Sequence, residues 1–446
     1  MNTSKMKVIW IGDKRHSTEK LPVRYKLEWG TKTFNFLGVQ FSVNLNDIPD
    51  LNYVKILDKS KTIIHNWKRR CLTPLGKITI IKTFIISNFN YLFASIPSPD
   101  NLFISNLNKL LFSYLWDNKP DKITRTCVIQ DYKEFGLRMI DLTSHINALK
   151  LAWINKLLKD NSSQFCKIVE QTILPVAEIS KFGSDWLKRF LKKMYNPFWK
   201  EVFTILINVL DKDQLCHKNE LLISPLWYNP KIFKNAFFIP KWFSSGIGFV
   251  SDVLDDQGVL LTQQQLEQKF SVNINFLDYY RVKFSVGLFL RNNSNLDGSL
   301  EQPTQPFIPN HIAFLSKNKT AKGIYEKLKC KNKTQMAFQR KWHNDLNLNL
   351  DHASRQYVFK LCFKTSGDVY HKWFQCRILH QILATQELLN KMGISNSPTC
   401  LSCQADIESL PHLFYFCPNA KYLWIQLESK MKNSVNFSVH LTPMDT

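Results

Sequence analysis

Apolar residues recur every three or four positions along several long stretches of this chain, which is the pattern of amphipathic helices. The clearest helix is predicted to begin at Pro74, with Thr73 as its N-cap, because proline suits the first helical position. Pro97 ends it. Similar patterns predict helices over about 48–70 and 101–116, so three helices joined by short turns form a small bundle. The apolar stripe of the helix that begins at Pro74 consists of Ile78, Ile81, Ile85, Phe89, Leu92 and Ile96.

Short strands are predicted near the N-terminus, over 7–11 and 34–41, because both stretches are rich in aromatic and β-branched residues. Beyond the bundle, the stretch 222–248 is rich in proline and tryptophan and predicts an irregular connector, and 292–310 predicts a linker. The predicted fold class is mainly α with a small N-terminal β part. Further helices are predicted over about 142–158, 184–195 with Ser184 as N-cap, 198–210 and 334–392.

The composition favours a nucleic-acid partner and a reducing compartment. Lys and Arg number 59 against 36 Asp and Glu, giving a formal net charge of +23 that attracts polyanions. At 44% hydrophobic residues the chain can bury cores, so disorder is not expected. Most of the ten cysteines are isolated and the N-terminus lacks the apolar core of a signal peptide. The longest apolar stretch is broken by Lys82, so no membrane span is expected.

Soft metal ligands converge in one short stretch near the C-terminus. Cys400, Cys403, His412 and Cys417 form a C-x2-C-x8-H-x4-C array, which can supply the four-coordinate shell of structural zinc. A chance cluster of buried thiols is the alternative. A redox Cys-x-x-Cys is disfavoured because it needs a strand-to-helix setting, with no His and third Cys close by.

The residues around the last two ligands predict their local structure. Pro418 keeps Cys417 out of the helical region and suits the first helical position, so Cys417 is predicted to be the N-cap of a helix that runs through Trp424. His412 follows Pro411 and is predicted to lie on a short turn that faces the first two ligands.

Other groups of polar residues allow a structural interpretation beside a functional one. Trp67 stands beside three cations, Lys68, Arg69 and Arg70, a composition that suits base stacking with phosphate contact. A tryptophan packed under a basic helix end explains it equally well. His371 and His380 share a predicted basic helix with Lys372 and Arg377, which favours a solvated face over phosphate contact.

Two further groups are interpreted as structural. Asp255–Asp256 is the single Asp-Asp pair of the sequence, and Gly258 after it predicts a solvated turn. No aromatic residue precedes this pair as in a polymerase turn. Cys216–His217 has no second pair of ligands nearby, which indicates a buried thiol beside a surface histidine.

Seven blocks, in order, resemble the part of LINE-type non-LTR retrotransposon reverse transcriptases that follows the polymerase active site. Near the C-terminus, Leu379–Thr385 followed by the Cys/His array resembles the family's zinc-binding segment. The other blocks are Asn2–Lys7, Phe36–Val39 (the family's Y-L-G-[IV] strand), Leu72–Lys82 (its L-[ST]-x2-G-[KR]-x3-[IV]-K thumb helix), Tyr114–Trp116 (F-x-W, with Tyr for Phe), Phe135–Leu137 (G-G-L, with Phe for the first Gly) and Pro225–Pro230 (P-L-W-x-N-P).

The resemblance implies a division into four parts. These are a palm remnant with short strands at 1–45, a thumb-like helical bundle at 46–120, a helical connector with the aromatic, proline-rich segment at 121–310, and a C-terminal helical domain with a zinc knuckle at 311–446. Because the family's thumb grips the template-primer duplex, the resemblance implies nucleic-acid contacts at Lys68, Arg69, Arg70, Lys77 and Lys82, and we add Lys372 and Arg377.

Reverse-transcriptase chemistry needs aspartates that hold magnesium beside the primer end, and this sequence shows no such motif. We therefore expect a C-terminal fragment that grips template-primer or element RNA, with RNA and DNA as partners and structural zinc as cofactor. No membrane and no small-molecule substrate are expected, and the location implied is a nuclear and cytoplasmic ribonucleoprotein. The alternatives are a stand-alone zinc-containing RNA-binding or scaffold protein derived from a retroelement, or a decayed copy.

Overall fold

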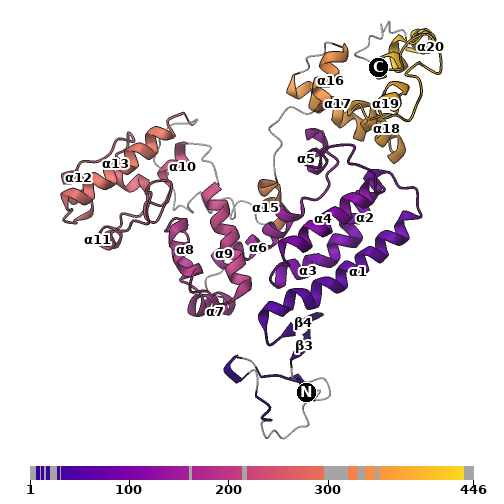
Figure 1. The fold of residues 1–446 in the computed structure, drawn as a ribbon. Helices are drawn as coiled ribbons and strands as arrows, with labels where there is room; N and C mark the ends of the chain where they lie inside the picture. The colour runs from indigo at the N-terminus through magenta and orange to yellow at the C-terminus, as the bar shows by residue number, and fades with distance from the viewer. Residues whose placement is uncertain are drawn as a thin grey trace. The chain divides into compact units, whose positions relative to one another are not determined.

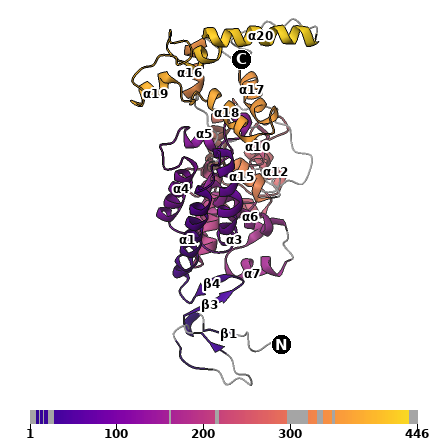
Figure 2. The same cartoon turned by 90° about the vertical axis from the view of Figure 1, so that its right-hand side faces the viewer.

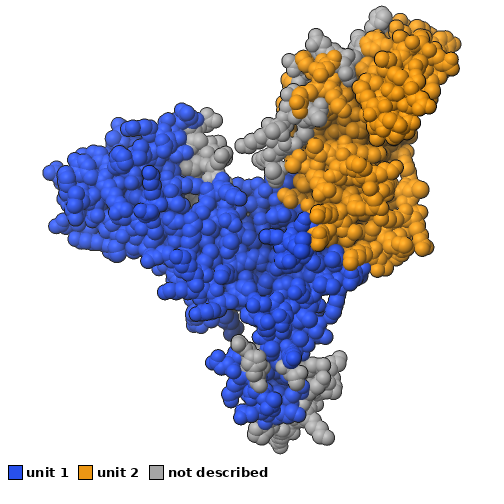
Figure 3. Space-filling view, in the orientation of Figure 1, with its two compact units in different colours: residues 1–59, 87–105, 142–329 blue, residues 60–86, 106–141, 330–446 orange. Residues whose placement is uncertain are grey.

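The chain is mainly helical, as the sequence predicts, and forms two compact units. The computed structural model describes residues 7–10, 12–14, 17–20, 28–30, 32–159, 163–212, 218–295, 320–329, 337–346 and 351–435. Unit 1 comprises residues 1–59, 87–105 and 142–329, and unit 2 comprises residues 60–86, 106–141 and 330–446 (Figure 3). The predicted bundle range 46–120 therefore contributes to both units.

The N-terminal strands form two small sheets in unit 1. β1 (Lys7–Val8) pairs in parallel with β2 (Glu28–Trp29), and β3 (Thr33–Phe36) pairs antiparallel with β4 (Val39–Ser42). Leu37 and Gly38 join β3 to β4 with φ angles of 48° and 81°. Positive φ at both positions gives a two-residue turn that matches the strand twist. Helix α1 (Ile48–Lys68) follows as predicted, after the 3₁₀ turn η3 (Leu45–Asp47).

The helix predicted over 74–96 is present, but its middle is not regular α-helix. Thr73 caps it as expected, with Oγ1 accepting from the Gly76 N–H at 3.4 Å. The segment η4 (Ile81–Ile86) is π-helical and separates α2 (Pro74–Ile80) from α3 (Ser87–Ser95). The apolar stripe is buried nevertheless, and the helix ends before Pro97. In unit 1, Tyr53 stacks on Phe93 of α3, with ring centroids 5.5 Å apart.

The core of unit 1 is built largely from helices after residue 142, and α8 and α9 lie side by side in it (Figure 1). Gly183, not Ser184, precedes α8, so the predicted cap is displaced by one residue. The predicted connector 222–248 is irregular apart from α11, and its Trp227 is fully buried, with Nε1 donating to the Ile247 carbonyl at 2.7 Å. The helices are α6 (Leu142–Lys159), α7 (Gln164–Thr172), α8 (Ser184–Leu191), α9 (Pro197–Lys212), α10 (Lys218–Leu222), α11 (Pro240–Ser244), α12 (Gln263–Phe270), α13 (Phe276–Asn292) and α15 (Ala321–Leu328), with 3₁₀ turns η6 (Val176–Glu178) and η7 (Val250–Val253).

Unit 2 packs α16 and α17 against the segment around Phe135. The Phe135 ring lies 4.7 Å from Phe359 and 5.4 Å from Phe338, centroid to centroid. Gly136 follows it, where a Cβ would lie 2.1 Å from the Gln130 carbonyl oxygen, so a side chain cannot be accommodated there. The elements of unit 2 are α1 from residue 60 onward, α2, η4, α4 (Asn101–Leu115) from residue 106 onward, α5 (Arg125–Ile129), η5 (Tyr132–Glu134), α16 (Ala337–Leu346), α17 (His352–Lys364), α18 (Val369–Leu379), α19 (Gln386–Lys391), η8 (His412–Phe416) and α20 (Pro418–Val435).

Among the described helices, none combines the length and apolar content that crossing a bilayer requires.

Candidate metal centre

A tight turn brings the first two ligands together. Thr399 and Ile407 form an isolated antiparallel bridge, and the Cys400 N–H donates to the Asp406 carbonyl at 2.8 Å. Between them the chain reverses, with the Gln404 N–H donating to the Cys400 carbonyl at 2.9 Å. Gln404 has a φ of 58°, the left-handed conformation that such a reversal requires. The Cys400 and Cys403 side chains consequently face the same space.

The other two ligands come from the segment that leads into α20. His412 is the first residue of the π-helical segment η8, where the sequence predicted a short turn. Cys417 has an extended ψ of 132°, and its carbonyl accepts from the Lys421 N–H at 2.9 Å. Cys417 is therefore the N-cap of α20, as Pro418 predicts. Figure 2 shows α20 as one uninterrupted helix.

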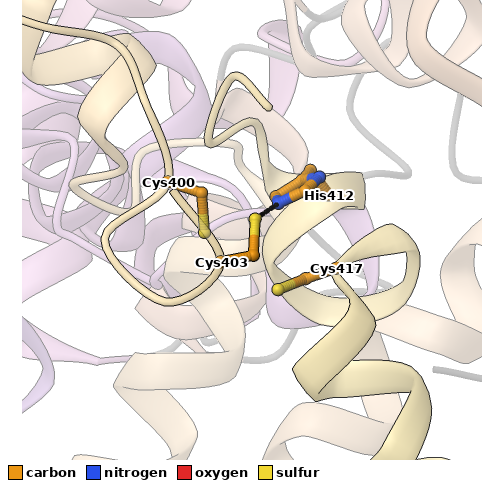
Figure 4. A group of neighbouring side chains, drawn as sticks. All are labelled: Cys400, Cys403, His412 and Cys417. Atoms are coloured by element: carbon orange, nitrogen blue, oxygen red, sulfur yellow. Dashed lines mark hydrogen bonds between the residues drawn. The ribbon is translucent and has the colours of Figure 1, made fainter. Parts of the chain in front are cut away.

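The four side chains converge on one point (Figure 4). Their ligand atoms all lie within 4.8 Å of one another, and Cys403 Sγ is 3.3 Å from His412 Nε2. A tetrahedral zinc with Zn–S bonds of about 2.3 Å separates two sulfurs by roughly 3.8 Å, so the cluster is close to the size that zinc needs. Three thiols and one imidazole are a common donor set for closed structural sites.

Hydrogen bonds prepare one thiol for metal binding. The backbone N–H groups of Ala405 and Asp406 lower the pKa of Cys403 to about 6, which favours the thiolate that zinc binds. Burial raises the pKa of Cys400. His412 is buried, and its Nδ1 lies 4.0 Å from the Asp406 carboxylate, on the far side of the ring from Cys403. This arrangement orients Nε2 toward the ligand cluster.

Glu408 supports the site and was not predicted from the sequence. Its buried carboxylate accepts from the Leu401 N–H at 3.1 Å and from the Gln386 N–H at 3.0 Å. It therefore connects the turn between Cys400 and Cys403 to the start of α19. A lone glutamate with backbone partners has no sequence signature, because any residue can supply the N–H groups.

Comparison with known families bears on this region. A family model described as zinc-binding in reverse transcriptase matches residues 320–424. Residues 320–424 are a reverse-transcriptase-associated zinc-binding region. Zinc is the cofactor of the region, and the matched residues include the cluster of Cys400, Cys403, His412 and Cys417, which is able to bind a metal ion.

Helix α18 of the zinc-binding region carries two of the predicted nucleic-acid contacts, Lys372 and Arg377. The same helix is tied to the end of α1 through Tyr370, whose hydroxyl donates to the Cys71 carbonyl at 2.8 Å. Lys68, Arg69 and Arg70 lie exposed just before Cys71. All seven predicted cations thus belong to unit 2, and a hydrogen bond joins the segments that carry five of them.

The contacts of Trp67 fit the structural interpretation, in which a tryptophan packs at a basic helix end. The Trp67 ring is half-buried and lies 5.7 Å from the Phe84 ring. The Arg70 guanidinium lies 4.7 Å from the Trp67 centroid, within cation–π range. Trp67 therefore packs against its neighbours while Arg70 lies over its ring. Lys82 is exposed.

Lys77 differs from the prediction of an exposed phosphate contact. Its side chain is buried, with Nζ 2.5 Å from the Asp117 carboxylate and 3.5 Å from the Leu115 carbonyl. Burial and the charges of Lys119, Arg377 and Lys77 lower the pKa of Lys122, a residue that the sequence did not single out. Arg377 and Lys77, far apart in sequence, therefore lie in one positively charged neighbourhood.

His380 is also placed differently. It is buried among aromatic rings, 5.1 Å from Phe338 and 5.3 Å from Phe359 between centroids, and burial lowers its pKa to about 4. It is neither a solvated nor a phosphate-binding residue. His371 is exposed, with Nδ1 3.4 Å from the Asp368 carboxylate.

The remaining two groups can be placed briefly. Asp255 and Asp256 form the predicted turn, in which the Asp255 carboxylate accepts from the N–H groups of Gln257 and Val259. Cys216 and His217 lie outside the described residues.

Proposed function

We propose that this chain is the nucleic-acid-binding C-terminal portion of a LINE-type reverse transcriptase, which grips template-primer or element RNA. The observation that carries the proposal is the Tyr370–Cys71 hydrogen bond, because it connects the zinc-binding region to the basic end of α1. A thumb and a zinc segment that act on one nucleic acid need such a connection. The net charge of +23 favours the same class of partner.

The zinc site has a structural role in this proposal. His412 and Cys417 lie at the two ends of η8, and Phe414 between them lies 6.2 Å from Phe374 of α18, centroid to centroid. By fixing η8, zinc fixes the surface on which α18 rests. Lys372 and Arg377 on α18 are then held beside the cations at the end of α1.

Salt dependence tests the proposal. The logarithm of the binding constant for a DNA duplex should fall by about 0.9 for each tenfold rise in salt concentration, for every phosphate contacted. Replacing Lys68, Arg69 and Arg70 together with Ala should flatten the slope by about two to three units if all three touch phosphate. The control variant replaces three exposed lysines of unit 1, Lys192, Lys193 and Lys200, with Ala. It removes the same amount of positive charge. Equal slopes for both variants would contradict the proposal.

We further propose that the chain does not polymerise DNA by itself, because its Asp-Asp pair forms an exposed turn whose Asp255 carboxylate is used by backbone N–H groups. Incubation with an RNA template, a DNA primer and magnesium or manganese should give no extension above a boiled control. Template-dependent incorporation would overturn this part.

A further inference from the structure

Helix α13 of unit 1 presents a row of aromatic rings to solvent. Its buried side consists of Tyr279, Val282, Val286 and Phe289. On the opposite side Phe276, Tyr280 and Phe284 are 58%, 49% and 68% exposed. They follow one another at intervals of four residues, so they lie on one face of the helix. The Phe276 and Tyr280 rings already touch, with centroids 4.4 Å apart.

Cations border this row of rings. Lys283 lies 5.9 Å from the Tyr280 centroid, and Arg291 is exposed on the same helix. Arg281 is also exposed, with its guanidinium over the Phe237 ring, 3.9 Å from the centroid. Viewed down the helix axis, Arg291 projects between Tyr280 and Phe284, and Lys283 projects beside Phe276. The one acid of α13, Asp278, is two residues from Phe276 and Tyr280 and therefore points to another side. The exposed face therefore carries aromatic rings and cations, with the exposed side chains of Leu277 and Leu288 beside Phe284.

This combination distinguishes between possible partners. Lysine is depleted at protein interfaces, so a second protein would not favour Lys283 beside the rings. Sites for single-stranded nucleic acids combine aromatic platforms with cations, because each base has a flat face and each nucleotide a phosphate. A base can stack on an exposed ring only if one face of the base is free of its neighbours. A duplex does not offer such bases.

We propose that Phe276, Tyr280 and Phe284 form a stacking platform for the bases of a single-stranded nucleic acid, with Arg281, Lys283 and Arg291 contacting its phosphates. The platform belongs to unit 1, whereas the cations that support duplex binding belong to unit 2. A single-stranded template or displaced strand is the class of ligand that it fits. The inference does not depend on duplex binding by the basic end of α1.

Two probes of equal charge separate base stacking from charge attraction. One is an oligothymidylate of about 15 nucleotides, within the usual size of such sites, and the other is an abasic strand of the same length. Fluorescence anisotropy gives the affinity for each. Replacing Phe276, Tyr280 and Phe284 together with Ala should weaken oligothymidylate binding by roughly fivefold or more per ring engaged, and leave abasic binding unchanged.

Control variants keep the result specific. A triple Leu variant at the same positions preserves apolar surface without flat rings, and it should lose affinity as the Ala variant does. Tyr195→Ala removes another exposed aromatic ring of unit 1 and should have no effect. Circular dichroism and zinc content should be unchanged in every variant, because these side chains are exposed.

Three results would overturn the platform. The first is unchanged oligothymidylate binding by the triple Ala variant, and the second is an equal loss on the abasic strand. The third is self-association of the wild-type chain that the triple Ala variant abolishes in sedimentation, which would make a second copy the occupant. This test remains valid even if Lys68, Arg69 and Arg70 prove not to bind duplex. It uses single-stranded probes rather than a duplex, and its variants lie in unit 1 rather than unit 2.

Discussion

Lys77 of α2 and Asp117, just after α4, form an ion pair in which Nζ lies 2.5 Å from the carboxylate oxygen. Lys77 is buried, whereas the Asp117 side chain is 63% exposed. The pair links two segments of unit 2 that are 40 residues apart. Its geometry gives the lysine a structural role at the position where the resemblance implied a nucleic-acid contact.

Removal of Asp117 should therefore destabilise unit 2 more than removal of the lysine charge. Asp117→Asn leaves a buried ammonium without its counter-charge and should lower the free energy of unfolding by about 2 kcal/mol. Lys77→Met retains the volume without the charge and should cost less. Urea unfolding measures both. Lys77→Met should also leave the salt slope of duplex binding unchanged. A slope that is flatter by about 0.9 would instead show that Lys77 contacts a phosphate.

Stability should rise at alkaline pH because of Lys150 in unit 1. This side chain is fully buried, 3.1 Å from the Glu201 carboxylate, and burial lowers its pKa from 10.5 to about 8. Between these values the unfolded chain binds the proton and the folded chain does not, so unfolding becomes less favourable as the pH rises from 8 to 10.5.

The measurement compares wild type with Lys150→Met, which removes the titrating group. The difference in unfolding free energy between the two should change by about 3 kcal/mol across that pH range. Subtracting the two curves cancels the tyrosines and cysteines that titrate in the same range. A pH-independent difference would contradict the lowered pKa of Lys150.

Local patterns were enough to predict several elements and the four side chains of the Cys/His cluster. Thr73 and Pro74 marked a helix start, and Pro418 marked the end of the ligand stretch at Cys417, because proline restricts its own backbone and that of its neighbour. The Cys/His spacing identified the ligands because zinc geometry is short-range. These predictions depended on residues close in sequence.

Features that depend on distant partners were not predictable. His380 looked like a surface residue of a basic helix, but its aromatic neighbours Phe338 and Phe359 come from other helices. Lys77 looked like a phosphate ligand because Asp117 lies 40 residues away. Helix α13 escaped prediction because aromatic residues occupy both of its faces, which weakens the periodicity that marks an amphipathic helix.

Glu408 should matter for zinc affinity without binding the metal. Glu408→Ala leaves the N–H groups of Leu401 and Gln386 without their acceptor and should weaken zinc binding about 10- to 100-fold, as is usual for supporting residues. Competition with a chromophoric chelator measures the affinity. The matched control is Glu387→Gln, which removes an acid of α19 that pairs with Lys391. Equal affinities for wild type and Glu408→Ala would exclude the supporting role.

Loss of one ligand should remove the ion and unfold only its surroundings. Structural zinc contributes on the order of 10 to 16 kcal/mol of apparent binding free energy, which is enough to supply most of the local folding energy. Cys403→Ser or His412→Ala should therefore abolish the tightly held zinc, measured by elemental analysis of freshly purified protein. Hydrogen exchange should become fast over about 398–429 and stay slow in α2 and α4, which contribute no ligand.

The matched control for zinc loss is Cys71→Ser, which removes an exposed thiol of unit 2 outside the cluster and should retain one zinc per chain. Because Phe414 in η8 lies against Phe374 of α18, exchange at α18 should also accelerate in the ligand variants, although less than in η8 itself. A zinc-free wild type would exclude the metal site. Zinc loss without faster exchange over η8 would show that packing, rather than the metal, holds His412 and Cys417 in place.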